Sequence, residues 1–141
     1  MQTFMPYSDF KKSAACLDNK RLGKQRVEVL TILRILSGQV SSWKNHPAVL
    51  MWKGWTNLLA TYGLYMCEEW IRRGFKDTCY SKIEDFITPS GGSEIKRIPW
   101  MGNEAFHASH RSNLLRKNYE FYKKYNWSEP DNLPYYWPVR K

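Results

Sequence analysis

The residues with the clearest chemical potential lie in one basic segment, residues 20–28 (KRLGKQRVE). On a helix, side chains three and four residues apart share a face, so Arg21, Gln25 and Glu28 project from one arc and Lys24 lies beside them. A carboxylate among cations at the edge of an apolar surface can act as a general acid or base while the cations hold a polyanion. The alternative is a solvated Lys24–Glu28 ion pair worth a few tenths of a kcal/mol.

The charge balance indicates a polyanionic partner. Lys and Arg number 22 against 13 Asp and Glu, a formal charge of +9, and hydrophobic residues make up 43% of the chain. This composition is typical of a globular protein, with DNA or RNA as the first candidate partner and an anionic membrane surface as a weaker one. No apolar run approaches the roughly 18 residues of a membrane span. Three cysteines without a C-x-x-C pair fit a reducing compartment, so we expect a cytoplasmic, nucleoid-associated protein.

The elements that must position these residues are expected to be helices. The 141 residues predict a single domain, 1–141, that is all-α and compact. Helical spacing and capping residues predict three main helices, two short ones, a surface loop and an aromatic tail wrapped over the helices. The main helices run from Asp18 to Gly38, from Asn45 to Gly74 and from Asn103 to Leu115; the short helices end at Cys16 and Phe86; the loop is Thr88–Ser93 and the tail Tyr119–Trp137.

Two sequence patterns that contain histidine could bind a ligand. His107 and His110 share one face of the third helix, as metal ligands do, although no cysteine or H-E-x-x-H pattern accompanies them. Phosphate contact or helix packing are the alternatives that we favour, and we expect no metal. His46 precedes Pro47 at a helix N-terminus, where it either caps the helix or contacts phosphate.

A second basic cluster precedes the aromatic tail. Arg111, Arg116 and Lys117 are followed by a segment in which aromatic residues alternate with cations, including Tyr122, Lys123 and Lys124. Cations that bind phosphate and rings that stack on bases are typical of nucleic-acid contact. The alternative is that the rings belong to the core and the lysines to a solvated face.

Three parts of the chain, in colinear order, resemble the phage-type pyrimidine-dimer DNA glycosylases, also called the endonuclease V type of dimer repair enzyme. The spacing of Arg21-Leu22 to Glu28 is similar to that of a His-Leu pair and the catalytic glutamate in that family. Residues 72–78 (RRGFKDT) resemble the end of its second helix, and residues 121–125 (FYKKY) its C-terminal aromatic segment. With its Met-Gln-Thr-Phe start, the chain is more similar to a cellular branch than to the phage prototype.

The resemblance implies a helical monomer that kinks double-stranded DNA, flips out a nucleotide and needs no cofactor. In such enzymes the N-terminal amine attacks C1′ of the damaged nucleotide, and a glutamate, matched by Glu28, assists the sugar steps. Because Gln2 is bulky, the initiator methionine is expected to stay, so the amine of Met1 is the candidate nucleophile and Lys20 or Lys24 the alternative. Arg21 replaces the family's histidine and can hold phosphate but not exchange protons.

We therefore expect a DNA glycosylase with abasic-site lyase activity on damaged or modified pyrimidines. The expected catalytic residues are Glu28, Met1 and Arg21. The expected DNA contacts are Lys20, Lys24, Gln25, Arg26, His46, His107, His110, Arg111, Arg116, Lys117, Tyr122, Lys123 and Lys124. Two alternatives remain open: an enzyme that acts on a flipped modified base without cutting the strand, and a DNA-binding module without catalysis.

Overall fold

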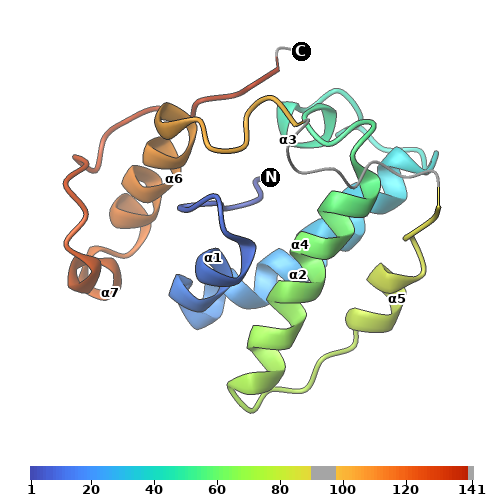
Figure 1. Cartoon of the computed structure of the whole chain (residues 1–141), viewed down its shortest axis with the longest axis horizontal. Coiled ribbons are helices and arrows are strands. Elements are labelled where there is room, and N and C mark those ends of the chain that lie inside the picture. The colour runs from blue at the N-terminus through green and yellow to red at the C-terminus, as the bar shows by residue number, and fades with distance from the viewer. Residues whose placement is uncertain (90–97, 140–141) are drawn as a thin grey trace.

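The computed structural model describes residues 1–89 and 98–139, and all regular elements in this part of the chain are helices, as predicted (Figure 1). The three main helices α2, α4 and α6 are joined by short helices and extended segments. In chain order the helices are α1 (Phe10–Cys16), α2 (Asn19–Leu36), α3 (Pro47–Leu50), α4 (Thr56–Arg72), α5 (Tyr80–Glu84), α6 (Glu104–Lys117), α7 (Tyr119–Tyr122) and a 3-10 turn over Lys123–Tyr125.

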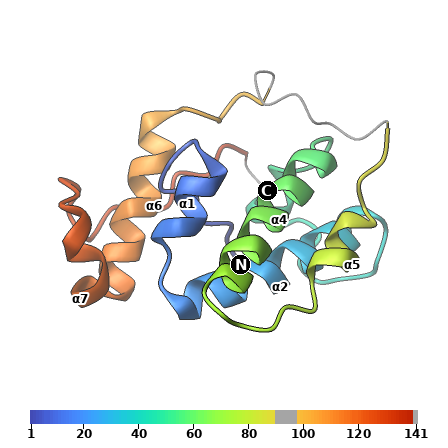
Figure 2. The same ribbon diagram turned by 60° about the horizontal axis from the view of Figure 1, so that its bottom comes forward.

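Helices α2 and α4 lie side by side and form the main body of the core (Figures 1 and 2). Their contact depends on Gly63, because a Cβ atom built there would lie 2.6 Å from Val29 Cγ1 and 3.2 Å from Ile83 Cδ1. Any larger residue would push the two helices apart. Glycine at this position therefore permits the close packing of α2 and α4.

The prediction of one helix from Asn45 to Gly74 is wrong, since two helices occupy this range. Helix α3 ends at Leu50 and α4 begins at Thr56. Between them Gly54 has φ +85°, a left-handed conformation that interrupts helical hydrogen bonding. The cap also differs from the predicted Asn45, because the side chain of His46 accepts a hydrogen bond of 3.0 Å from the N–H of Ala48.

The other helix starts agree more closely with the capping prediction. Asp9 and Asn103 accept hydrogen bonds from backbone N–H groups of α1 and α6, as N-caps do. Asp18 occupies the N-cap position of α2, but its carboxylate binds Tyr122 Oη and Arg21 instead of the helix backbone. Part of the predicted loop Thr88–Ser93 lies outside the described residues.

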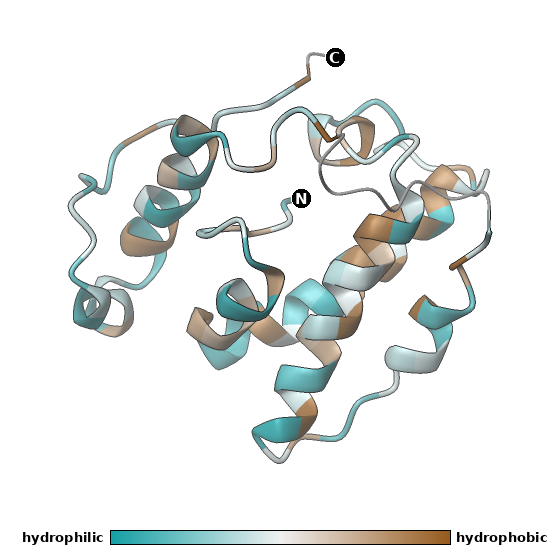
Figure 3. Cartoon of the chain, viewed as in Figure 1, coloured by the Kyte–Doolittle hydropathy of each residue, from teal (hydrophilic) through white to brown (hydrophobic). Residues whose placement is uncertain are grey.

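Helix α6 is mostly polar yet largely buried, because both ends of the chain pack against it. Figure 3 shows hydrophilic residues along much of α6. Ser109, Ser112 and Asn113 bind backbone groups of the tail: Ser109 Oγ accepts from the N–H of Tyr136, Ser112 Oγ accepts from the N–H of Leu133, and Asn113 donates to the carbonyl of Leu133. These bonds hold the tail against α6, consistent with a tail that wraps over the helices.

Candidate active site

A pocket of about 420 Å³ opens between the N-terminal segment, the first half of α2, the end of α6 and the tail. Its wall includes the predicted catalytic residues Met1, Arg21 and Glu28. The rest of its lining is formed by Gln2, Phe4, Lys20, Lys24, Gln25, Lys117 and Tyr135. The structure thus brings together, in one cavity, both ends of the chain and the basic segment singled out in the sequence.

Residues 2–4 of the N-terminal segment are fixed to α2 and α4 by buried side chains. Gln25 accepts a hydrogen bond of 2.9 Å from the N–H of Phe4 and donates one of 3.0 Å to the carbonyl of Gln2. The hydroxyl of Tyr62 lies 2.7 Å from the carbonyl oxygen of Phe4 and 2.6 Å from Gln25 Oε1. Satisfied polar groups in a buried site hold a segment in one position.

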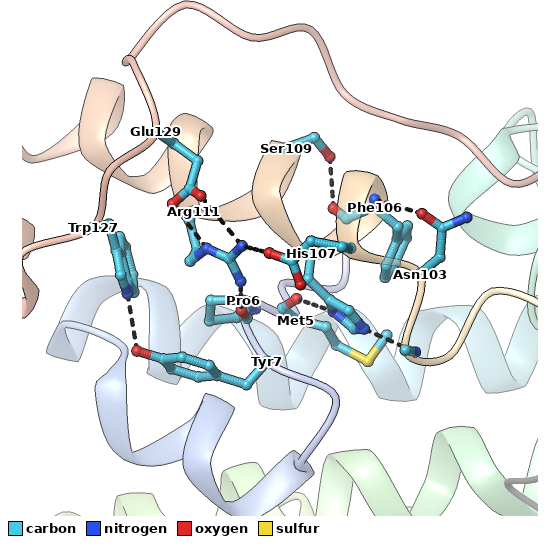
Figure 4. A network of polar contacts seen from close by, with 12 residues as sticks. Met5, Pro6, Tyr7, Asn103, Phe106, His107, Ser109, Arg111, Trp127 and Glu129 are labelled. Atoms are coloured by element: carbon cyan, nitrogen blue, oxygen red, sulfur yellow. Dashed lines mark hydrogen bonds and ion pairs between the residues drawn. The ribbon is translucent and has the colours of Figure 1, made fainter.

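Residues 5 and 6 are fixed to α6 in the same way (Figure 4). His110 Nδ1 accepts a hydrogen bond of 2.8 Å from the N–H of Met5, and His107 Nδ1 lies 2.8 Å from the Met5 carbonyl oxygen. Arg111 donates to the carbonyl of Pro6 at 2.7 Å and to Glu129 at 2.9 Å. The segment that leads to Met1 is therefore held from three helices.

Glu28 is half-buried at the pocket wall, close to the N-terminus. Burial raises its pKa above the usual range of a glutamic acid, and the α-amino group of Met1, a hydrogen bond from the N–H of Gln2 and the charge of Lys24 oppose this rise. A carboxylic acid whose pKa is moved towards neutrality exchanges protons more readily at physiological pH. The amine and the carboxyl thus share a site suited to covalent and acid–base chemistry.

The cations around the pocket give it a strongly positive character. Burial lowers the pKa of Lys117, and the neighbouring cations Arg21, Arg116, Lys24 and Lys20 lower it further. Cations that repel one another in this way are stabilised by an anion bound between them. A phosphate of a nucleic-acid backbone is such an anion.

Four of the predicted DNA contacts prove to be internal supports. Gln25, His107 and His110 are buried, and their side chains bind the N-terminal segment. Arg111 is 8% exposed and binds Glu104, Glu129 and Pro6. For His107 and His110 these contacts agree with the packing alternative, and for all four residues we propose that they position the N-terminal segment.

Two further predicted contacts lie away from the pocket. Arg26 binds Asp77, in the connection between α4 and α5, and lies over the ring of Trp70 of α4. Tyr122 is fully buried, and its hydroxyl binds Asp18. The proposal for DNA binding given below therefore does not use these two residues.

The remaining predicted contacts lie on the surface. Arg116 is exposed beside the pocket, whereas Lys123 binds Glu120 at 2.8 Å and Lys124 lies 4.0 Å from the ring centre of Phe121. His46 caps α3 and packs between Trp43 and Trp137. For these residues DNA contact stays a prediction.

A metal centre finds no support in the described ranges, where no three His, Cys, Asp or Glu side chains gather as ligands. The ring nitrogens of His107 are occupied by the Met5 carbonyl and by the N–H of Gly102. His110 and His107 both have lowered pKa values because of burial, in the case of His110 to about 3. Both rings are therefore neutral at pH 7 and serve as a clamp on the backbone.

Comparison with protein families identifies the family of the chain. The family model described as pyrimidine dimer DNA glycosylase matches residues 1–82, more than half of the chain. The chain belongs to the pyrimidine dimer DNA glycosylase family. Membership in this family, whose members repair DNA, makes DNA the substrate class. No curated protein and no solved structure matches the chain.

The family match covers the pocket wall formed by residues 1–28 of this glycosylase but not the wall formed by residues beyond 82. Lys117 and Tyr135 come from the unmatched part. A bilayer-crossing helix is not found among the described residues.

Two aromatic residues that line the pocket were not among the site residues predicted from the sequence. Phe4 and Tyr135 line the cavity, and their ring centres lie 6.4 Å apart. The pattern Pro134-Tyr135-Tyr136-Trp137-Pro138 holds a usable signal, because residues between prolines tend to be extended and alternate between two sides. The sequence does not show which residues pack against each side of this extended segment.

Proposed function

We propose that this protein is a DNA glycosylase with abasic-site lyase activity on damaged or modified pyrimidines in double-stranded DNA. The amine of Met1 is the nucleophile, and Glu28 is the acid and base of the sugar steps. Arg21, Lys20, Lys24 and Lys117 hold the phosphates around the flipped nucleotide.

One observation carries the proposal: the N-terminal amine shares a positive pocket with a half-buried carboxyl. The amine lies close enough to Glu28 to lower the pKa of its carboxyl, and hydrogen bonds from α2, α4 and α6 fix the segment behind it. Every residue from Gln2 to Pro6 makes a hydrogen bond with a helix or with the α3–α4 connection, and these bonds fix the position of the N-terminal amine. Preorganisation of this kind removes the entropy cost of bringing the amine to its target.

The first chemical step joins the amine to the sugar. The neutral amine attacks C1′, the bond from C1′ to the base breaks, and the base leaves with the bonding electrons and the proton lost by the amine. Protonated Glu28 then gives its proton to O4′ as the C1′–O4′ bond breaks. The product is an iminium ion between the Met1 nitrogen and C1′.

The second step cuts the strand. The iminium ion makes the C2′ hydrogen acidic, and the Glu28 carboxylate formed in the first step removes it. The electrons pass through C1′–C2′ and expel the 3′ oxygen with its phosphate, after which water hydrolyses the imine and frees the amine. Glu28 ends the cycle in the state in which it began, so one carboxyl suffices for both proton transfers.

Borohydride trapping tests the mechanism directly. The protein is mixed with duplexes that carry a thymine dimer or an abasic site, and borohydride reduces any imine to a stable adduct. We expect an adduct on both DNAs, mapped by mass spectrometry to Met1. An adduct on the abasic site alone would retain the lyase and exclude the thymine dimer as substrate.

A variant with two extra residues before Met1 is the matched control. It moves the amine out of the pocket but leaves every cation in place, so trapping should be lost while DNA affinity is kept. Trapping through Lys20, Lys24 or Lys117 would assign the nucleophile to a lysine. Tight binding with no adduct on either DNA would overturn the lyase mechanism and favour action on a flipped base without strand cutting.

A further inference from the structure

A row of aromatic rings runs from the pocket wall to an exposed tryptophan. Tyr135, which lines the pocket, lies 5.5 Å from Trp137 between ring centres. Trp137 lies 5.4 Å from His46, and His46 lies 5.4 Å from Trp43. We refer to Tyr135, Trp137, His46 and Trp43 as the aromatic row. It joins two segments that are about 90 residues apart in the sequence.

The backbone of the tail determines which rings enter the row. The tail is extended, so neighbouring side chains point to opposite sides. The N–H of Tyr136 binds Ser109 of α6, and its hydroxyl lies 3.5 Å from Asn103. Tyr135 and Trp137 therefore share the other side, where Trp137 meets His46.

The outer end of the row is open to solvent although it is strongly apolar. Trp43 is 48% exposed and Val40 is 96% exposed, and both belong to the connection between α2 and α3. The adjacent Lys44 is exposed as well. An apolar ring presented beside a cation, in continuity with a positive pocket, suits a ligand that carries both flat apolar rings and negative charge.

We propose that the aromatic row is a stacking track for unpaired bases of the DNA strand that leaves the pocket. The proposal rests on the function given above, because the pocket end of the track must hold the target nucleotide. Trp43 and His46 meet edge to face at 62°, as do His46 and Trp137 at 89°, and Trp43, which is 48% exposed, offers a ring of a size that matches a base. The protein therefore prefers DNA whose bases beside the target are unpaired over a fully paired duplex.

Binding to three DNAs of one sequence tests this preference. Each carries a tetrahydrofuran residue, which mimics an abasic site but cannot form an imine: a full duplex, a duplex with four mismatched pairs beside the tetrahydrofuran, and the single strand. Fluorescence anisotropy should show tighter binding of the mismatched duplex than of the paired one. Because stacking on one ring is worth roughly ten-fold in affinity, Trp43→Ala should lose about that factor on mismatched and single-stranded DNA and less than about two-fold on the duplex.

Two further variants make the test specific. Trp43→Phe keeps an aromatic face and should retain most of the affinity. Phe75→Ala removes another exposed ring, one that lies beyond the C-terminal end of α4 and stacks on Trp70, and should change no affinity. Equal losses on all three DNAs, or none, with Trp43→Ala would overturn the stacking track.

The outcomes separate this inference from the proposed function. Trapping at Met1 combined with no effect of Trp43→Ala would retain the lyase and reject the track. Selective loss with Trp43→Ala combined with no trapping would support the track as a DNA-binding surface and reject the lyase.

Discussion

His107 and His110 bind the two polar groups of a single residue, the carbonyl oxygen and the N–H of Met5. Their spacing of three residues, which could serve a metal ion, serves instead to hold an extended segment across one turn of α6. The position of Met1 therefore depends on two neutral histidines.

This clamp should make stability depend on pH. Burial lowers the pKa of His110 from 6.5 to about 3, so between these values the unfolded chain binds a proton that the folded chain does not. Stability is full above about pH 6.5 and should fall by about 1.4 kcal/mol per pH unit below it from this group. His110→Gln keeps an acceptor for Met5 and removes the titration, so urea denaturation from pH 7 to pH 4 should show a shallower decline. An unchanged slope in His110→Gln would contradict the prediction.

Glu28→Gln should abolish strand cutting and borohydride trapping while DNA affinity stays within about two-fold, because the amide keeps the shape of the carboxyl but cannot transfer protons. Since burial raises the pKa of Glu28, the rate in the wild type should change with pH in a range above that of an ordinary glutamic acid, and the variant should lack this change. Single-turnover cleavage of an abasic duplex across pH 4 to 8 measures both. Glu68→Gln, on the exposed face of α4, is the matched control. Equal loss of binding and cleavage in Glu28→Gln would make Glu28 a structural residue.

Lys24→Ala and Lys117→Ala should each weaken binding to duplex DNA and reduce the dependence of log affinity on log salt by about one ion. The reason is that each removes one cation that lines the pocket. Anisotropy titrations at salt concentrations from about 50 to about 200 mM measure the slope of log affinity against log salt. Lys82→Ala removes an exposed cation on α5, and we expect it to leave the slope unchanged. A slope unaffected by both pocket variants would remove these lysines from the DNA-binding surface.

Gly63→Ala should destabilise the fold by about 1–3 kcal/mol, because the new methyl group would overlap Val29 where α2 and α4 meet. Chemical denaturation measures the loss. Adding Val29→Ala makes room for the methyl group, so the double variant should be more stable than the sum of the two single losses predicts. If the losses in free energy of unfolding were strictly additive, the methyl group of Gly63→Ala would be accommodated by separation of α2 and α4 and not by a clash with Val29.

The sequence predicts a helix well where apolar spacing and capping residues determine its bounds. It predicts the site only in part. The spacing of apolar residues in α2, and the caps Asp9 and Asn103, are local signals, and they gave the elements close to their observed bounds. The break at Gly54 was missed because glycine is compatible with a helix until its φ is known. The placement of Met1, Arg21 and Glu28 in one pocket agrees with the resemblance and with the helical arc of α2.

The errors concern side chains whose neighbours are distant in the sequence. His107, His110 and Arg111 look like exposed polar residues on a polar helix, and only the arrival of residues 5 and 6 against α6 buries them. For Tyr122 the sequence leaves both a DNA contact and a place in the core open, because its partner Asp18 lies 104 residues away. Burial of this kind follows from tertiary contacts, which no local pattern encodes.

The order of synthesis gives the anchoring of the N-terminal segment a further meaning. The amine is made first, but the histidines that hold Met5, and the Lys117 and Tyr135 that close the pocket, leave the ribosome more than a hundred residues later. A chain that stopped before α6 would therefore lack the residues that hold Met5 and one wall of the pocket. Under the proposed mechanism, we expect the amine of Met1 to react with DNA only after α6 and the tail have folded against the N-terminal segment.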